Sequence, residues 1–216
     1  MNIAIILAGG SGTRFKSKIP KQYFKIGNKS IINFTIDSFE RSSLIDRIII
    51  VVDEKYINQI SKENPKHIVV SGGKSRFESS YNGILACPKN SKKVLIHDAA
   101  RPFVTQKIIT SCIEALDNYE AVVTSIQTTD TVIRSKNMEV VQVEDRSQIF
   151  LNQTPQGFDY KIILNAHKNR TESVTDDISL LDLNKIRCKI IKGSKKNIKI
   201  TTNDDIEFAI NILNQN

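Results

Sequence analysis

Short apolar runs alternate with amphipathic segments along most of the chain. Ile3–Leu7 is a continuous apolar run of strand length, and in Arg47–Val52 five apolar residues follow Arg47. Such runs are typical of strands buried on both faces of a sheet. Further strands are predicted at 67–70, 94–97 and 121–125, and helices at about 30–41, 56–63, 78–86 and 105–118. Strands that alternate with helices in this way predict an α/β fold with a Rossmann-like, doubly wound, mostly parallel sheet.

The pattern changes after residue 126. Thr131–Arg134 and Val140–Glu144 are short alternating runs on either side of Ser135-Lys136-Asn137, which predicts a hairpin with little core of its own. Beyond Pro155 we expect helices at about 159–169 and 176–183, strands near 189–192 and 198–201, and a last helix at 204–213. No linker-like or repetitive segment interrupts the chain. We therefore expect one domain over residues 1–216, with a protruding β-arm at about 128–150.

The composition is that of a globular protein. Of the 216 residues, 40% are hydrophobic and 25% are charged, which argues against a disordered or fibrous chain. The absence of an 18-residue apolar run predicts no transmembrane helix. The three cysteines are scattered and have no CxxC spacing, so we expect neither disulfides nor a zinc site, and a reducing, cytoplasmic location.

The net charge points to anionic partners. Thirty-one Lys and Arg against 23 Asp and Glu leave +8, which suits nucleic acid, phosphorylated metabolites or an acidic membrane, unless it only reflects a Lys-rich surface. Nucleic-acid binding is disfavoured because aromatic residues make up only 6%, Trp is absent and the basic residues are dispersed. Phosphorylated small molecules remain the favoured class.

Three loops at predicted strand ends carry the candidate chemistry. In an open parallel sheet, ligands bind beyond the carboxyl ends of the strands. The residues there are Ala8–Arg14 after the first strand, Gly72-Gly73 after the third, and Asp98–Pro102 after the fourth.

The glycine-rich first loop allows several interpretations. It lacks the Gly-Lys-Ser/Thr of the Walker loop. Gly10-Ser11-Gly12 supplies half of a dinucleotide-binding fingerprint, but Phe15 replaces the last glycine and Asp53 lies too far downstream. The remaining interpretations are a tight surface turn and a nucleotidyltransferase loop followed by Arg14 and Lys21. Glycines in such a loop let backbone N–H groups approach phosphate oxygens closely.

Further motifs then occur in order along almost the whole chain. They are Leu7–Arg14, Pro20–Phe24, Gly72-Gly73-x-x-Arg76-x-x-Ser79, His97–Pro102, Asp130-Thr131, Asp145-Arg146, Gln153–Gln156, Thr175–Leu180 and Asn197–Thr202. Together they resemble the signature of the cytidylyltransferases that activate polyol phosphates. These are the 2-C-methyl-D-erythritol 4-phosphate cytidylyltransferase family, which serves the non-mevalonate isoprenoid pathway, and its ribitol-5-phosphate-activating relatives.

The resemblance implies a CTP site built on these loops. Arg14 and Lys21 take the family's transition-state-stabilising positions, and Asp98 the position that holds Mg²⁺ against the triphosphate. The full implied CTP-binding set is Ala8, Gly9, Gly10, Gly12, Arg14, Lys21, Gly73, Ser79, Asp98 and Ala99. Lys74 stands where some relatives carry an acidic residue. Asp176-Asp177 could suggest a metal pair, but we favour a helix N-terminus, where acidic residues complement the dipole.

The resemblance also implies a second, cationic site for the polyol phosphate. Its members are Arg101, Thr131, Arg146, Thr154, Thr175 and Lys199. In the family, Arg101 and Thr131 reach the site of the neighbouring subunit. A hairpin with little core should bury itself on a partner, so we expect a homodimer.

Two substrates compete. Methylerythritol phosphate is favoured by Thr175–Leu180, by Asp145-Arg146 before Thr154, and by the short chain. Ribitol 5-phosphate is favoured by Leu7–Gly10 with Thr13, which look more like the ribitol-activating relatives. The sequence favours methylerythritol phosphate.

Overall fold

The central sheet has seven strands. The computed structural model describes residues 1–10, 19–169, 174 and 176–214. The strand order is β11-β7-β10-β6-β1-β4-β5, and the pairings along it show that β10 alone runs antiparallel to its neighbours. The strands span β1 Asn2–Ala8, β4 Arg47–Val52, β5 Ile68–Ser71, β6 Lys93–Asp98, β7 Ala121–Gln127, β10 Phe150–Asp159 and β11 Cys188–Lys192. The predicted doubly wound, mostly parallel α/β fold is confirmed.

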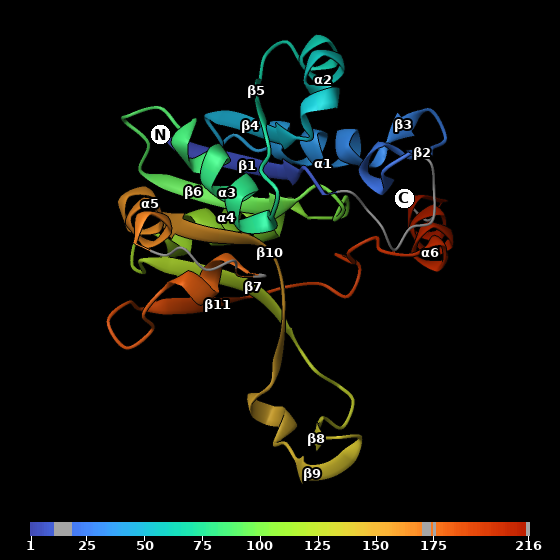
Figure 1. Ribbon diagram of the computed structural model, residues 1–216, viewed down its shortest axis with the longest axis vertical. Helices are drawn as coiled ribbons and strands as arrows, with labels where there is room; N and C mark the ends of the chain where they lie inside the picture. The colour runs from blue at the N-terminus through green and yellow to red at the C-terminus, as the bar shows by residue number, and fades with distance from the viewer. Residues whose placement is uncertain (11–18, 170–173, 175, 215–216) are drawn as a thin grey trace.

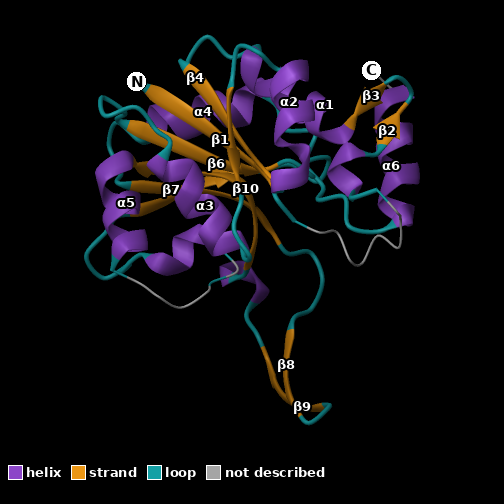
Figure 2. Cartoon of the chain, turned by 45° about the horizontal axis from the view of Figure 1, so that its top comes forward, coloured by secondary structure: helices purple, strands orange, loops and turns teal. Residues whose placement is uncertain are grey.

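Helices cover both faces of the sheet (Figures 1 and 2). The helices are α1 Ile31–Glu40, α2 Ile57–Glu63, α3 Arg76–Leu85, α4 Gln106–Ala115, α5 Tyr160–Lys168 and α6 Asn203–Asn214. Alternate residues of β1 point to opposite faces, because side chains of a strand alternate. Ala4, Ile6 and Ala8 therefore pack with α1, α2 and α4, whereas Ile3 and Ile5 pack with α3 and α5.

Strand β10 is the main feature that the sequence pattern did not predict. The middle of this segment is polar and contains Pro155, a pattern that argues against a central strand. In the structure the β10–β7 register shifts between Asn152 and Gln156, and Pro155 lies inside that irregularity, preceded by a cis peptide bond. Gln153, Thr154 and Gln156 are nevertheless buried. Tertiary hydrogen bonds thus replace the apolar pattern that normally marks a buried strand.

The segment after α5 differs from the prediction in two places. Residues 176–183 form only a short 3₁₀ turn, Asp177–Leu180, and residues 198–201 form no strand. Instead, the Ile200 N–H donates to the Ala100 carbonyl at 2.8 Å. Ile200 also packs in a small third core with α6 and the short β2–β3 hairpin (Lys25–Ile26 and Lys29–Ser30). This packing brings the C-terminal segment beside the β6 loop.

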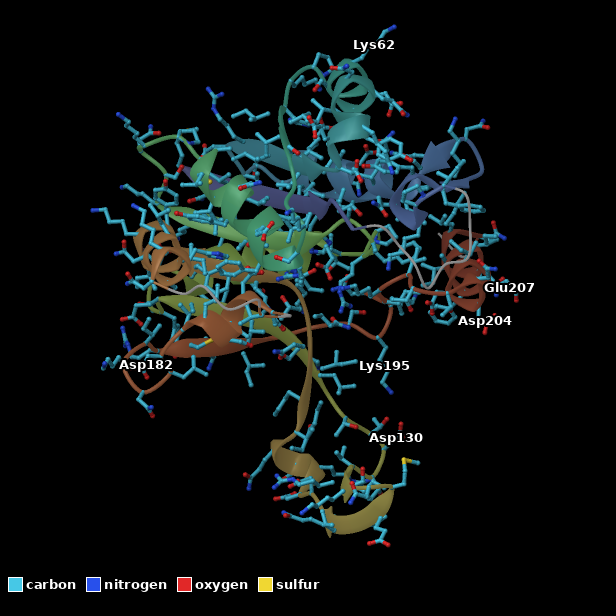
Figure 3. All side chains as sticks on the ribbon, in the orientation of Figure 1. Lys62, Asp130, Asp182, Lys195, Asp204 and Glu207 are labelled. Atoms are coloured by element: carbon cyan, nitrogen blue, oxygen red, sulfur yellow. The ribbon has the colours of Figure 1, made fainter. Side chains whose placement is uncertain are left out.

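The arm extends away from the sheet (Figure 1). It carries β8 Ile133–Lys136, β9 Glu139–Val143 and a 3₁₀ turn at Arg146–Gln148. Figure 3 places Asp130 on this arm, far from Asp204 and Glu207 on α6. Every residue of β8 and β9 is exposed, so the hairpin has no core of its own, as predicted.

Within the described part of the chain, no helix is both long and apolar enough to cross a membrane.

Candidate active site

A cavity of about 490 Å³ opens at the carboxyl ends of β1, β4, β5 and β6. This is where an open parallel sheet binds ligands, and the volume suits a nucleotide-sized molecule. Of the predicted site residues, those that line the cavity are Ala8, Gly9, Gly10, Lys21, Gly73, Ser79, Asp98, Ala99 and Lys199. Gly12 and Arg14 lie outside the described residues.

The side chain of Gln22 holds the backbone on both sides of Gly9, where the glycine-rich loop begins. Its side-chain Nε2 donates to the carbonyl of Ala8 at 2.7 Å and to that of Gly10 at 2.8 Å. Gln22 is buried and lies in a 3₁₀ turn, Lys21–Tyr23, that also carries Lys21 to the cavity. The contacts of Gln22 thus couple the loop backbone to the element that presents the cationic side chain. Gln22 lies in the Pro20–Phe24 motif, but the sequence predicts no role for it.

The Gly72-Gly73 loop after β5 needs glycine at position 73, because this loop packs tightly on the start of α3. A Cβ on Gly73 would lie 2.2 Å from the Cβ of Glu78. Ser75 caps α3 by accepting from the Glu78 N–H, and the Glu78 carboxylate accepts from the Lys74 N–H, a reciprocal cap. Ser79 in turn accepts from the Gly73 N–H at 3.1 Å. The loop backbone is therefore held rigidly at the cavity wall.

Asp98 is the electrostatic centre of the cavity. Lys199 Nζ lies 2.7 Å from its Oδ2, Arg76 Nε 3.5 Å from its Oδ1, and Arg101 Nε 3.9 Å from its Oδ2. Burial alone would raise the pKa of Asp98, but the charges of Lys199 and Arg76 outweigh burial and hold its pKa well below the usual range. The carboxylate is therefore charged, and three cations meet around it.

Asp98 fits the chemistry expected of a Mg²⁺ ligand. Mg²⁺ is commonly held by one or two carboxylates together with substrate phosphates and water, and Asp98 supplies an anionic carboxylate at the cavity wall. Among the described residues, no group of three or more His, Cys, Asp or Glu side chains could hold a metal ion without help. A metal here would depend on the phosphates of the substrate.

The side chain of Arg101 belongs to the site of its own chain. Its Nη1 donates to the Asn197 carbonyl at 2.8 Å, and its Nε faces Asp98. Only 12% of the side chain is exposed. These contacts tie Arg101 to the loop that carries Lys199. A reach of Arg101 to a neighbouring subunit stays a prediction.

Thr154 lies beneath the cavity floor. Its hydroxyl accepts from the Asp98 N–H at 3.1 Å and lies 3.0 Å from His97 Nδ1, and the residue is 4% exposed. His97 Nε2 contacts the Arg101 carbonyl at 3.0 Å. Burial lowers the pKa of His97 to about 4, so the imidazole is neutral at physiological pH. In this arrangement Thr154 and His97 orient the Asp98–Arg101 loop.

Thr131 and Arg146 lie on the arm and do not line the cavity. Thr131 is exposed, and Arg146 Nη1 donates to the Thr129 carbonyl at 3.1 Å. Thr175 lies outside the described residues. The structure thus gathers Lys199 and Arg101 at Asp98 and leaves the two arm residues apart from them.

Two further side chains at the site had no predicted role. Arg76 lines the cavity. The side-chain amide of Gln153 holds the segment before Lys199: its Nε2 donates to the Ser194 carbonyl and its Oε1 accepts from the Ser194 N–H. Both lie in motifs that the sequence displays, but only the tertiary contacts reveal what they touch.

Fold and cavity together define an α/β protein with a cavity at the start of a glycine-rich loop, where converging cations around one carboxylate suit a phosphorylated ligand. The family model described as 2-C-methyl-D-erythritol 4-phosphate cytidylyltransferase matches residues 2–215. The chain belongs to this family.

Individual relatives agree with this assignment. A 2-C-methyl-D-erythritol 4-phosphate cytidylyltransferase of Clostridium acetobutylicum is 41% identical, over 100% of this chain and 99% of the relative. One from Clostridium botulinum is 38% identical, with 98% and 97% covered. A crystal structure of the 4-diphosphocytidyl-2C-methyl-D-erythritol synthase of Anaerococcus prevotii superposes with a TM-score of 0.88 at 32% identity and covers 99% of this chain and 96% of that one.

Proposed function

We propose that this protein transfers CMP from CTP to 2-C-methyl-D-erythritol 4-phosphate and releases pyrophosphate, a step in the synthesis of isoprenoid precursors. Family membership supports the reaction. The observation that carries it in this chain is the cavity beside the glycine-rich loop, where Lys21 lines the wall and Lys199, Arg76 and Arg101 surround a charged Asp98. Such a site suits two anionic substrates that must be brought together.

The chemistry needs no protein nucleophile. A phosphate oxygen of the polyol substrate attacks the α-phosphorus of CTP, the new P–O bond forms, and the bond from that phosphorus to the bridging oxygen breaks, so that pyrophosphate leaves. Because the attacking group is already an anion, catalysis rests on positioning and on stabilising charge at the five-coordinate phosphorus. Lys21, at the cavity wall, and Arg14 are assigned this stabilisation.

We assign the remaining predicted residues either to CTP or to the polyol phosphate. Contacts to the nucleoside are assigned to Ala8, Gly9, Gly10, Gly12, Gly73, Ser79 and Ala99. Lys199 and Arg101 supply positive charge for the polyol phosphate on the same chain, and Thr175 is assigned to the same substrate. Mg²⁺, held by Asp98 and the phosphates of CTP, would neutralise negative charge on the triphosphate. Since Lys199 pairs with Asp98 in this structure, a metal bound there would free its ammonium group for the second phosphate.

We also propose that the active form is a homodimer in which the arm carries Thr131 and Arg146 to the neighbouring site. The apolar side chains of the arm support this: Met138 is 95% exposed, Val143 63% and Val140 61%. Several exposed apolar side chains on one short hairpin are typical of an interaction site. All three cysteines are free thiols, which agrees with the proposed cytoplasmic location.

Pyrophosphate release tests the substrate assignment directly. CTP with 2-C-methyl-D-erythritol 4-phosphate should give a kcat/KM at least tenfold above that with ribitol 5-phosphate, and omission of Mg²⁺ should abolish turnover. A tenfold preference for ribitol 5-phosphate would overturn the polyol assignment. Asp98→Asn keeps the shape of the side chain but removes its charge, so it should lower turnover and raise the Mg²⁺ concentration required. Full activity with unchanged Mg²⁺ dependence in this variant would contradict the metal role.

A further inference from the structure

A buried acidic residue, Asp177, lies behind the cavity and has no part in the mechanism above. It is 0% exposed, and three side chains from two helices converge on it. Arg76 Nη1 donates to its Oδ2 at 2.6 Å, Ser80 Oγ donates to its Oδ1 at 2.6 Å, and His167 Nε2 lies 3.5 Å from the same oxygen. Both carboxylate oxygens are therefore occupied.

The scaffold around Asp177 is rigid. Arg76 and Ser80 are four residues apart on α3 and so share one face of the helix. His167, on α5, stacks on Phe77 and Tyr81 with ring centroids 4.7 and 5.4 Å away. Asp177 itself begins a 3₁₀ turn. Two helices and this turn thus lock the carboxylate in place.

Arg76 connects this buried carboxylate to the cavity. The same guanidinium that donates to Asp177 at 2.6 Å lies 3.5 Å from Asp98 with its Nε. It also lines the cavity. A guanidinium between two carboxylates is drawn to the closer one, and here that one is Asp177. Arg76 therefore lends positive charge to Asp98 without forming the tight bidentate pair that would occupy both of its oxygens.

We propose that Asp177 is a positioning residue, which holds Arg76 back from Asp98 and so keeps the Asp98 carboxylate placed and accessible for the Mg²⁺–CTP complex. The inference deepens the proposed function and rests on it. If Asp177 lost its charge, Arg76 would shift its pairing to Asp98 and compete with any other cation there.

The test uses Asp177→Asn, Arg76→Lys and the double variant in the full chain. Asp177→Asn keeps the shape and the hydrogen bond from Ser80 but removes the charge. Arg76→Lys keeps the charge, but one ammonium group cannot span both carboxylates. Ile163→Val on α5 is a matched control, since Ile163 is fully buried in the same core and its side chain carries no charge and no hydrogen-bonding group. Calorimetric titration of CTP over a series of Mg²⁺ concentrations accompanies kcat, KM and Tm.

We expect Asp177→Asn to weaken CTP binding in Mg²⁺ at least fivefold, to raise the Mg²⁺ concentration for half-maximal binding, and to lower kcat about tenfold. The double variant should bind and turn over within twofold of Arg76→Lys alone, because Asp177 acts through Arg76. Ile163→Val should change only Tm.

Two results would overturn the proposal: CTP affinity and kcat of Asp177→Asn within twofold of the wild type, or effects of the two changes that simply add. If Asp177→Asn does not fold, unchanged Mg²⁺ dependence of CTP binding in Arg76→Lys overturns it equally. Calorimetry with CTP does not involve the polyol, so failure of the polyol assignment would leave this test standing.

Discussion

At the scale of single residues, the charge of Lys21 carries the clearest functional consequence. Its side chain lines the cavity beside the glycine-rich loop. Lys21→Ala should lower kcat about a hundredfold or more, because it removes charge that stabilises the transition state. Arg14→Ala should have an effect of the same order. Steady-state kinetics with both substrates measures this, and Lys25→Ala, an exposed lysine four residues further on, is the control. Wild-type kcat in Lys21→Ala would rule out the catalytic role.

His97 makes stability depend on pH. Its pKa is about 4 when folded, against an ordinary value of 6.5, because burial disfavours the charged imidazole. Between these values the unfolded chain binds the proton that the folded chain excludes, so stability falls as pH drops from 6.5 towards 4. Relative to His97→Gln, the wild type should lose roughly 2–3 kcal/mol more unfolding free energy between pH 7 and pH 4.5. Urea titrations at both pH values measure the difference, and equal losses would show that His97 does not set it.

At the scale of elements, the 3₁₀ turn at Lys21–Tyr23 and the end of β1 act as one unit through Gln22. Gln22→Glu keeps the size but cannot donate to the two carbonyls, so CTP affinity should fall at least tenfold along with stability. Gln106→Glu is a matched control, since Gln106 Nε2 donates to the Ser38 carbonyl at 2.6 Å, away from the cavity. The control should lose stability but keep its affinity for CTP. If both variants bind CTP alike, Gln22 acts only on stability.

At the scale of the whole molecule, we expect the arm to form the contact between the two subunits of a dimer. Replacing Val140, Val141 and Val143 by Ser should shift sedimentation from dimer towards monomer and reduce activity, because exposed apolar surface is the proposed interface. Phe208→Ser is the control, since Phe208 is an exposed aromatic residue on α6, outside the arm. An unchanged sedimentation coefficient in the triple variant would exclude the arm as the dimer contact.

Shared sites have a separate test. Inactive Arg146→Ala mixed with inactive Lys21→Ala should recover part of the wild-type activity, because a mixed dimer contains one complete site if the arm acts in trans. Arg101 is unsuitable for this experiment, since it contacts Asp98 of its own chain. No recovery after confirmed subunit exchange would indicate that Arg146 acts within its own chain.

The fold class, and the strand ends at which the candidate cavity lies, could be predicted from the sequence. Continuous apolar runs at 3–7 and 47–52 can only be buried on both faces, and glycines that follow a strand mark the ligand-binding end of the sheet. These are local signals, since each depends on residues that are neighbours along the chain. They also carried the family resemblance, which the comparisons confirmed.

Which side chains contact one another could not be predicted from the sequence, because these contacts join segments that are far apart along the chain. Strand β10 was missed because its buried polar residues are satisfied by partners elsewhere, such as the Thr154 hydroxyl with the Asp98 N–H. Arg76 and Asp177 are 101 positions apart, and no periodicity reports their contact. The hydrogen bond from Arg101 to the Asn197 carbonyl likewise joins residues that are 96 positions apart. A local pattern of apolar residues indicates that apolar side chains are buried, whereas the burial and the partners of a polar or charged side chain are set by packing of segments distant in sequence.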